Sequence, residues 1–412
     1  MILVIDSSKQ FFKKAAFFCA ICSMVFIPIS TALMNIFLFL TLIFTIFGGD
    51  LKKSLFTIWN NPISRNTLLL FFFLALSLIW TIADIETGLR VLKKYNELWY
   101  VALILPLFNS NRRRDIGINA YLISMGIVLV GVYLMFFEII TPIEWTNNGH
   151  PQSFTVDGGF ASHVITNILM AFAMYISAHK TILSRSFWRL PYLIFFVFSF
   201  YYVLLISTGT SGQILAIALL LVLIAQYTGL KALLIVPLLL FFIAILGYNS
   251  ETNSLRFATE KLSIRYHHLI STDTAGNSTR PRIFVHAAKL LYHDKWFGSG
   301  VGSYEKKFQT YESEFYKVAT IARQNAHNEY LMISNQLGIA GLIFLIYIFY
   351  KQAVSTKMIG HREHKYLAQG LVFLIIIGCM GNSMILDSRE GYFWAFFTAL
   401  FFSNLDKNNN NA

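Results

Sequence analysis

The sequence predicts an all-α, polytopic integral membrane protein with about twelve transmembrane helices and a large, partly helical outer loop between helices 9 and 10. Hydrophobic residues make up 56% of its 412 residues, and charged residues only 13%. Soluble domains carry roughly 25% charged residues, so this composition excludes a soluble globular protein. Apolar runs of roughly 17 to 25 residues recur along the chain, and basic residues are concentrated in alternate loops between them.

The apolar runs give the predicted helices in order. A helix rises about 1.5 Å per residue, so about 20 apolar residues cross the hydrocarbon core of a bilayer. The predicted helices span residues 13–29, 31–48, 67–83, 88–108, 116–137, 161–178, 190–207, 213–229, 232–248, 328–350, 366–386 and 391–403, of which the last is short. No internal repeat relates the helices before residue 249 to those after it.

Lysine and arginine near helix ends mark the cytoplasmic side of a membrane protein. In this chain they precede helix 1 and follow helices 2, 4, 6, 8 and 10. Both termini are therefore predicted to be cytoplasmic, and the loops 138–160 and 249–327 are predicted to lie outside. The net charge of +12 is mostly this topology signal, so it gives little reason to expect nucleic acid as a partner.

These patterns divide the chain into four parts. Residues 1–248 hold helices 1–9, residues 249–327 form the outer loop, residues 328–403 hold helices 10–12, and residues 404–412 form a disordered cytoplasmic tail. Within the outer loop, residues 282–296 have the apolar spacing of an amphipathic helix on a membrane surface, and residues 304–322 resemble a second, more polar helix. We expect the three glycines between them, Gly298, Gly300 and Gly302, to form a flexible turn.

Basic residues on the outer side run against the topology signal and need their own explanation. Arg90, Lys93 and Lys94 lie at the outer end of predicted helix 4. Their stems can reach lipid headgroups, or their charges can bind an anionic group such as a pyrophosphate. Arg282 begins the amphipathic helix of the outer loop, close to Arg280. A guanidinium pairs bidentately with phosphate oxygens, so Arg282 is the strongest phosphate-binding candidate in this loop.

The junction between the outer loop and helix 10 opens with His327 and Asn328, where water meets lipid. Gly338 and Gly341 follow eleven and fourteen residues after the histidine, so a continuous helix would place all three on one face. Glycines on that face permit the close approach of a neighbouring helix. Neutral His327 can accept a proton from a hydroxyl, although taken alone it also fits a purely structural role.

No metal or cofactor is predicted. The histidines show no H-x-x-x-H or carboxylate-rich spacing, and the three cysteines, Cys19, Cys22 and Cys379, lie in apolar runs as packing residues do. A lipid or polysaccharide flippase is an alternative of another class. It would need a polar central cavity, and the near-absence of ionisable residues at mid-membrane depth argues against one.

The chain resembles the bacterial O-antigen ligase family of polytopic inner-membrane glycosyltransferases, most specifically over residues 276–341. The first motif of this resemblance is His327-Asn328, nine residues, then Gly338-x-x-Gly341. The other two motifs are Arg282 followed by an apolar helix and Gly298-x-Gly300-x-Gly302, and, more weakly, Asn382-Ser383 through Asp387 to Glu390-Gly391. The twelve-helix layout with its large outer loop is also similar to that family.

The resemblance implies an inverting transfer without a metal or other cofactor. A glycan would leave an undecaprenyl pyrophosphate carrier and join a hydroxyl of the lipid A-core acceptor on the periplasmic face of the inner membrane. His327 would activate or position the hydroxyl, and Arg282 would stabilise the departing pyrophosphate. The implied donor-binding residues are Arg90, Lys93, Lys94, Arg280 and Thr210, and the supporting residues are Asn328, Gly338, Gly341, Asp387 and Glu390. An O-antigen polymerase and a protein O-oligosaccharyltransferase use the same donor and remain alternatives.

One position departs from the family pattern. Many members carry an arginine in the short outer turn between helices 7 and 8, and Thr210 stands at that place in this chain. A hydroxyl can hydrogen-bond a phosphate but cannot neutralise its charge. Either Arg90, Lys93 or Lys94 supplies the missing charge, or this chain handles a different donor or acceptor.

Overall fold

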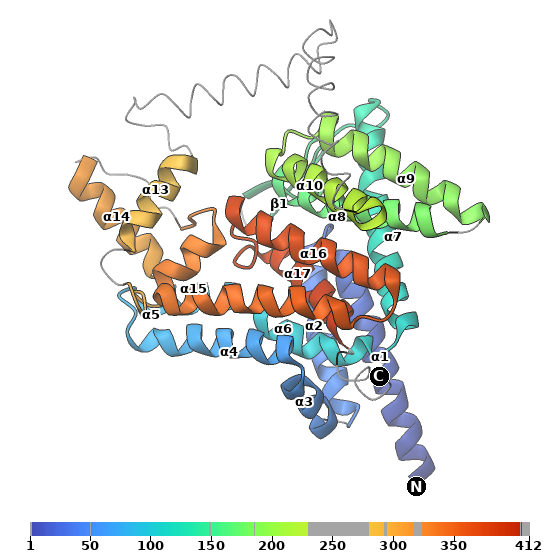
Figure 1. The fold of residues 1–412 in the computed structure, drawn as a ribbon, viewed down its shortest axis with the longest axis horizontal. Coiled ribbons are helices and arrows are strands. Elements are labelled where there is room, and N and C mark those ends of the chain that lie inside the picture. The colour runs from blue at the N-terminus through green and yellow to red at the C-terminus, as the bar shows by residue number, and fades with distance from the viewer. Residues whose placement is uncertain are drawn as a thin grey trace, which may run out of the picture.

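The computed structural model describes residues 2–49, 51–147, 150–184, 186–229, 280–291, 295–316, 324–403 and 405. The chain folds as a bundle of helices with one short β-hairpin in the part described (Figure 1). The predicted helix at 232–248 and the first part of the outer loop lie outside the described residues, as does most of the predicted C-terminal tail.

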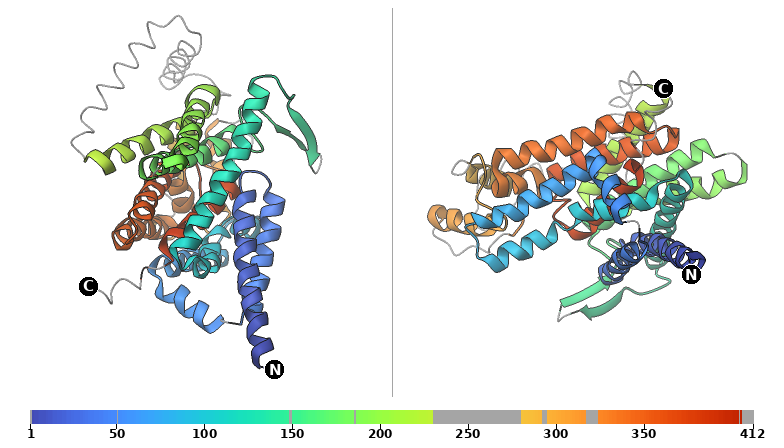
Figure 2. Two further views of the ribbon diagram at one scale, coloured as in Figure 1. Left: turned by 90° about the vertical axis from the view of Figure 1, so that its right-hand side faces the viewer. Right: turned by 90° about the horizontal axis from the view of Figure 1, so that it is seen from below.

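The first two helices form an antiparallel pair, and the chain bends sharply before the third. Helices α1 (Ile2–Phe26) and α2 (Thr31–Phe47) pack side by side (Figure 2). The hydroxyl of Ser30 accepts a hydrogen bond from the Leu33 amide and so begins α2. A short helix, α3 (Leu51–Asn60), leads to α4 (Pro62–Leu76), where Asn61 caps the first turn. A 3₁₀ turn (Ser77–Ile79) follows α4 at its other end.

The predicted helix 88–108 is wrong as a single element. The structure has α5 (Ile85–Lys94), then α6 (Glu97–Ile104), then a 3₁₀ turn (Leu105–Phe108). Helix α5 is amphipathic, whereas α6 is almost entirely buried. A partly exposed helix and a buried helix cannot continue along one axis here, and the chain turns between them at Tyr95 and Asn96. Pro106 then prevents regular continuation of the second helix, because it has no amide hydrogen to donate.

The central helices are α7 (Asn111–Phe136), α8 (His163–Leu183), α9 (Arg189–Tyr201) and α10 (Thr210–Thr228). Between α7 and α8 lies an antiparallel hairpin of β1 (Ile143–Asn147) and β2 (His150–Phe154), in the loop 138–160 that was predicted to be external. The all-α prediction contained no strand here. A π turn (Tyr202–Ile206) ends α9 and leads into the turn before α10.

The last helices are α13 (Arg280–Leu290), α14 (Ser303–Tyr316), α15 (Glu329–Ser355), α16 (Arg362–Gly381) and α17 (Ser388–Phe402). The short α17 lies at the centre of the molecule and packs against α6, α8 and α16. Its aromatic side chains, including Phe393, Trp394 and Phe397, are fully buried. A helix enclosed by protein on every side need not match the thickness of a bilayer, which explains its length.

Six helical segments in the part of the chain that the structure describes are long and apolar enough to cross a membrane. They are Pro62–Ile79, Asn111–Phe136, Arg189–Ile206, Thr210–Thr228, Glu329–Met358 and Arg362–Gly381, and α2 with α3 would make a seventh if the bent pair counts as one span. The prediction of a helical chain with several helices able to cross a membrane is therefore confirmed, whereas twelve spans and the external position of the long loop stay predictions.

Candidate functional site

Helix α15, which follows His327, is broken in its first half. Gly338 has φ 67° and ψ −162°, a conformation that residues with a side chain rarely adopt. The break leaves backbone groups without helical partners. Residues 295–300 supply new ones. The carbonyl of Gln336 accepts a hydrogen bond from Gly300 at 2.9 Å, and the amide of Ile339 donates to the Lys295 carbonyl at 2.7 Å.

The segment 298–302, here called the glycine loop, therefore fits into α15 by backbone contact. A Cβ on Gly298 would lie 2.5 Å from the Gln336 carbonyl oxygen, and one on Gly300 would lie 2.6 Å from Cβ of Thr81. Gly298, Gly300 and Gly302 all have positive φ values, from 66° to 84°. The loop is thus held between the break in α15 and the segment joining α4 to α5. The expectation of a flexible turn is wrong, because each glycine is needed for a fixed, close contact.

The expectation that His327, Gly338 and Gly341 share one helical face is also wrong. Helix α15 begins only at Glu329, and the Asn328 side chain caps it by accepting a bond from the Leu331 amide at 3.0 Å. His327 precedes the helix with φ 51°, and the break at Gly338 interrupts the helical repeat. The glycine loop, not a neighbouring helix, approaches Gly338.

Asn325 holds His327 against the loop between α16 and α17. The His327 amide donates to Asn325 Oδ1 at 2.8 Å, and the Ser383 hydroxyl donates to the same oxygen at 2.6 Å. Asn325 Nδ2 donates to Asp387 Oδ1 at 3.3 Å. Asn325 was missed in the sequence, because an asparagine in a polar segment carries no pattern of its own.

Asp387 connects this cluster to the basic end of α5. Burial raises the pKa of the Asp387 carboxyl, while the charge of Lys94 and the hydrogen bond from Asn325 lower that pKa. A narrow cleft beside them is lined by Arg90, Lys94, Glu305, Gln324, Gln336 and Leu386, among others. Two of the three predicted cations of helix 4 therefore border the residues around His327. Lys93 is exposed on the same helix and does not line the cleft.

Arg90 also joins α5 to α14. Its Nη2 lies 3.5 Å from Glu305 Oε2, and its side chain remains 54% exposed. An ion pair this exposed contributes little to stability, so the guanidinium can change partner at low cost.

A buried carboxylate, Glu329, links the loop after α16 to the glycine loop. Glu329 is fully buried and accepts hydrogen bonds from the amides of Ile385 and Leu386 at 2.9 and 3.1 Å. The Tyr95 hydroxyl donates to it at 3.1 Å and in turn accepts a bond from Gln336 Nε2 at 3.1 Å.

Gln336 completes the link, because its Oε1 accepts from the Gly302 amide at 3.0 Å. Sequence reasoning missed Glu329, although a carboxylate at the start of an apolar helix was a visible signal. Glu390, a predicted supporting residue, is buried in α17 and accepts a bond from Asn382 at 3.1 Å.

The two predicted arginines of the outer loop lie in the first turn of α13, which starts at Arg280 and includes Arg282. Helix α13 packs on α15 and α14. Asn335, just before the break in α15, donates to the Ala287 carbonyl at 3.0 Å and fixes this packing. The predicted amphipathic helix 282–296 is thus real but ends at Leu290, and the predicted helix 304–322 corresponds to α14.

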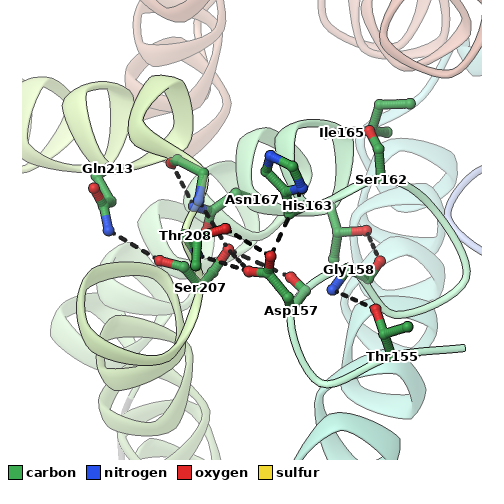
Figure 3. A network of polar contacts seen from close by, with 12 residues as sticks. Thr155, Asp157, Gly158, Ser162, His163, Ile165, Asn167, Ser207, Thr208 and Gln213 are labelled. Atoms are coloured by element: carbon green, nitrogen blue, oxygen red, sulfur yellow. Dashed lines mark hydrogen bonds and ion pairs between the residues drawn. The ribbon is translucent and has the colours of Figure 1, made fainter. Parts of the chain in front are cut away.

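The turn before α10, which ends next to Thr210, is organised by a carboxylate (Figure 3). Asp157 Oδ1 accepts from the Thr208 amide at 2.7 Å, and its Oδ2 accepts from the Thr208 hydroxyl at 2.6 Å. His163 Nδ1 lies 3.7 Å from Asp157 Oδ2, and Asn167 donates to the Gly209 carbonyl at 2.7 Å.

Helix α16 relates this turn to His327. Near the start of α10, Leu215 would lie 3.6 Å from a Cβ on Gly378 of α16, and the Met380 carbonyl two residues later accepts a bond from Asn328 at 2.9 Å. The N-terminal halves of α10 and α15 thus both adjoin the end of α16, and Figure 1 shows α16 between α10 and α15.

A comparison with protein families gives one match in this region. The family model described as O-Antigen ligase matches residues 193–346. The matched residues include most of α9, all of α10, the glycine loop, His327 and the break in α15, so the resemblance drawn from the sequence motifs is confirmed. No curated protein matches the chain.

Proposed function

We propose that this chain, whose residues 193–346 match the O-antigen ligase family model, transfers a glycan from undecaprenyl pyrophosphate to a lipid A-core hydroxyl. The reaction would take place on the periplasmic face of the inner membrane. The observation that carries the proposal is the link from His327, which lies in the matched region, through Asn325 to Asp387, whose carboxyl interacts with the charge of Lys94. Lys94 lines a narrow cleft together with Arg90. The family match supports a lipid-linked glycan donor and a lipid acceptor in general, and undecaprenyl pyrophosphate and lipid A-core are the specific substrates that we propose.

In the proposed reaction His327 accepts the proton of the acceptor hydroxyl or holds that hydroxyl in position. The hydroxyl oxygen attacks the anomeric carbon on the face opposite the pyrophosphate, so the configuration inverts. The bond from the anomeric carbon to the phosphate oxygen breaks, and its electron pair leaves with the pyrophosphate. Left-handed backbone at a residue with a side chain costs energy, and Asn325 stabilises it at His327 through the 2.8 Å bond.

Cations stabilise the charge that develops on the leaving group. We assign this role to Arg282 and Arg280 in the first turn of α13, with Arg90, Lys93 and Lys94 on α5. Fixed cations in a partly dry site stabilise a developing negative charge better than water does. Arg90 and Lys94 border the cleft, which supports the idea that α5 supplies the charge that Thr210 lacks. The Thr210 hydroxyl is left to hydrogen-bond a phosphate oxygen.

Reconstitution tests this function. Purified protein is mixed with carrier-linked glycan and lipid A-core, and the lipid A product is separated on a gel. We expect glycan joined to lipid A-core, with no added metal. If the protein makes no product but moves the carrier across vesicles, the flippase alternative replaces the enzyme.

A deletion strain separates the ligase from its closest alternatives. Loss of a ligase leaves polymer on the carrier and none on lipid A-core, whereas loss of a polymerase leaves single repeat units on lipid A-core. Loss of a protein O-oligosaccharyltransferase removes glycan from proteins and leaves lipopolysaccharide unchanged. We expect the first result.

A further inference from the structure

Large apolar side chains are exposed on α5 and on the segment between α13 and α14, which lie at the same end of the bundle (Figure 1). Ile85 and Leu89 of α5 are 61% and 51% exposed, and Trp296 and Phe297 of the segment are 69% and 63% exposed. These four residues are here called the apolar rim. Single exposed apolar residues are common, whereas a group of large ones indicates a contact surface.

Backbone hydrogen bonds hold the two parts of the apolar rim together and in place. Just before α5, the Ile82 amide donates to the Ser299 carbonyl at 3.1 Å. In α15, just after its break, the Ala340 amide donates to the Trp296 carbonyl at 3.1 Å. The exposed aromatic side chains are therefore carried by a fixed backbone, and their exposure is a property of the fold.

The apolar rim continues the exposed apolar faces of two helical segments that are long enough to cross a membrane, Pro62–Ile79 and Glu329–Met358. The helices α4 and α15 within them pack against each other. Exposed apolar residues recur on each at the three- and four-residue spacing of one helical face. They are Leu69, Phe72, Leu76 and Ile79 on the first segment, and Ile339, Ile343, Ile346 and Tyr350 on the second.

The apolar rim therefore lies where these two exposed faces end. Ile79 is three residues before Ile82, and Ile339 is directly before Ala340, which binds the segment of Trp296. If the two segments cross a bilayer, their exposed faces contact lipid, and the apolar rim lies at the boundary between hydrocarbon and water.

The residue types of α5 and of the segment beside it fit such a boundary. Lys93 lies one helical turn after Leu89 and is exposed beside it, and the next residue, Lys94, is exposed as well. Tryptophan and basic residues are both enriched at headgroup level, and an amphipathic helix with a basic polar face is typical of a membrane surface. This combination indicates a phospholipid surface as the partner.

Helix α13 uses its apolar face differently. The sequence predicts that its face lies on a membrane, yet Ile283, Ala287 and Leu290 are at most 4% exposed. The helix packs on α15 and α14 instead. The role of a helix at the membrane surface therefore moves from α13 to α5.

We propose that the apolar rim inserts into the phospholipid bilayer on the side of the membrane that holds His327. Its four side chains reach the upper part of the acyl chains, while Lys93 and Arg90 lie among the phosphate headgroups. The cleft lined by Arg90 and Lys94 is thereby fixed at headgroup level. This membrane contact does not depend on the proposed glycan transfer.

Spin-label accessibility tests the proposal on the whole protein in vesicles of phosphatidylethanolamine and phosphatidylglycerol. One label is attached to Leu89→Cys or to Phe297→Cys. The lipid reference is Phe72→Cys on the exposed face of α4, and the water reference is Gln309→Cys, an exposed position of the polar helix α14. Each variant carries alanine in place of the native cysteines, Cys19, Cys22 and Cys379.

Oxygen concentrates among acyl chains, whereas a nickel chelate stays in water. We expect labels at Leu89 and Phe297 to show a ratio of oxygen to nickel accessibility between those at Phe72 and at Gln309. A ratio equal to that at Gln309 would place the apolar rim in water and overturn the proposal. Low accessibility to both reagents would indicate a protein cover, such as a second copy of the chain, and would also overturn it.

A second measurement serves if the variants without native cysteines do not fold, as judged by their melting temperatures. Phospholipids brominated on the acyl chain quench nearby tryptophan, and the difference in quenching between wild type and Trp296→Phe isolates Trp296. We expect the quenched part of the fluorescence to fall in Trp296→Phe. Equal quenching of the unquenched signal of Trp296 with and without bromine would overturn the proposal.

Discussion

Gly298 and Gly338 face each other so closely that neither position can carry a side chain. A Cβ added to either glycine would lie 2.6 Å from the backbone nitrogen of the other. It would lie even closer to a neighbouring carbonyl group, at 2.5 Å from that of Gln336 for Gly298 and at 2.4 Å from that of Trp296 for Gly338. Gly298 belongs to the motif after Arg282, and Gly338 belongs to the motif after His327. Two motifs that are far apart in the sequence are therefore the two sides of one backbone contact, and this contact joins α13 and its arginines to the helix that follows the histidine.

Replacing Gly338 with alanine should destabilise this contact and reduce transfer strongly. The substitution adds a Cβ where the backbone of Trp296 lies and also places a side chain at φ 67° and ψ −162°, a glycine-only conformation that alone costs about 1 to 3 kcal/mol. We expect a lower melting temperature than wild type. Gly126→Ala is the control, because its added Cβ would only contact a Phe195 ring atom at 3.7 Å. Equal melting temperatures of the two variants would show that the contact is unimportant.

Asn325→Ala should reduce transfer by about tenfold or more without removing the protein from the membrane, because about 1.4 kcal/mol of lost positioning corresponds to a tenfold change in rate. Asn325 is a positioning residue, so we expect kcat to fall more than KM rises. Asn60→Ala, an exposed residue at the end of α3, provides the control. An unchanged kcat in Asn325→Ala would mean that the His327 backbone is held by other contacts.

Lys94→Gln should move the acid limb of the activity profile to higher pH. The charge of Lys94 lowers the pKa of Asp387 against the raising effect of burial, so removing that charge lets the pKa rise further. Protonated Asp387 accepts the hydrogen bonds from Asn325 less well, and activity is lost as pH falls through this pKa.

The control for this shift is Lys93→Gln, which removes the same charge one residue earlier on α5. Asp387→Asn should show no acid limb from this group. A shift of the same size in Lys93→Gln, or none in Lys94→Gln, would contradict the assignment.

The raised pKa of Asp387 also predicts how the stability of the folded protein depends on pH. Its pKa in the folded protein is raised above that of the unfolded chain, so its contribution to stability is fully present below the unfolded value and is lost as pH rises through the folded value. Asp387→Asn removes this loss. Between pH 4 and pH 7 the melting temperature of wild type should therefore fall relative to that of Asp387→Asn, and a parallel course of the two curves would contradict it.

Thr210→Arg should keep or raise transfer activity, because it would supply the cation that the resemblance implies at this position. Product formation at limiting donor measures the effect. Complete loss in Thr210→Arg would indicate that the turn has been rebuilt around the Thr210 hydroxyl and the Asp157 network, in which a guanidinium no longer fits.

The sequence predicts the helical membrane fold well, because hydrophobic runs and charged loops directly reflect the bilayer. It fails where local patterns depend on tertiary contacts. The run 88–108 is apolar enough for one helix, yet it divides at Tyr95, whose hydroxyl is bound by Glu329 and Gln336 from α15. Likewise, a helical wheel cannot reveal that Gly338 breaks its helix, since the break is stabilised by backbone groups of residues 295–300.

The candidate site was predictable only where residue type alone indicates a chemical role. His327, Arg90 and Lys94 are recognisable as residue types suited to proton transfer or phosphate binding. Asn325 and Glu329 act by orienting other groups, and such roles are visible only once the loop between α16 and α17 is placed beside α15.

The most direct test of the central claim compares His327→Ala and Arg282→Ala with wild type in the reconstituted transfer assay, using carrier-linked glycan and lipid A-core. A pH–rate profile of His327→Gln then distinguishes proton acceptance from positioning of the hydroxyl. We expect both alanine variants to reach the membrane at normal levels and to form no product. Full activity in either variant would contradict the role assigned to that residue.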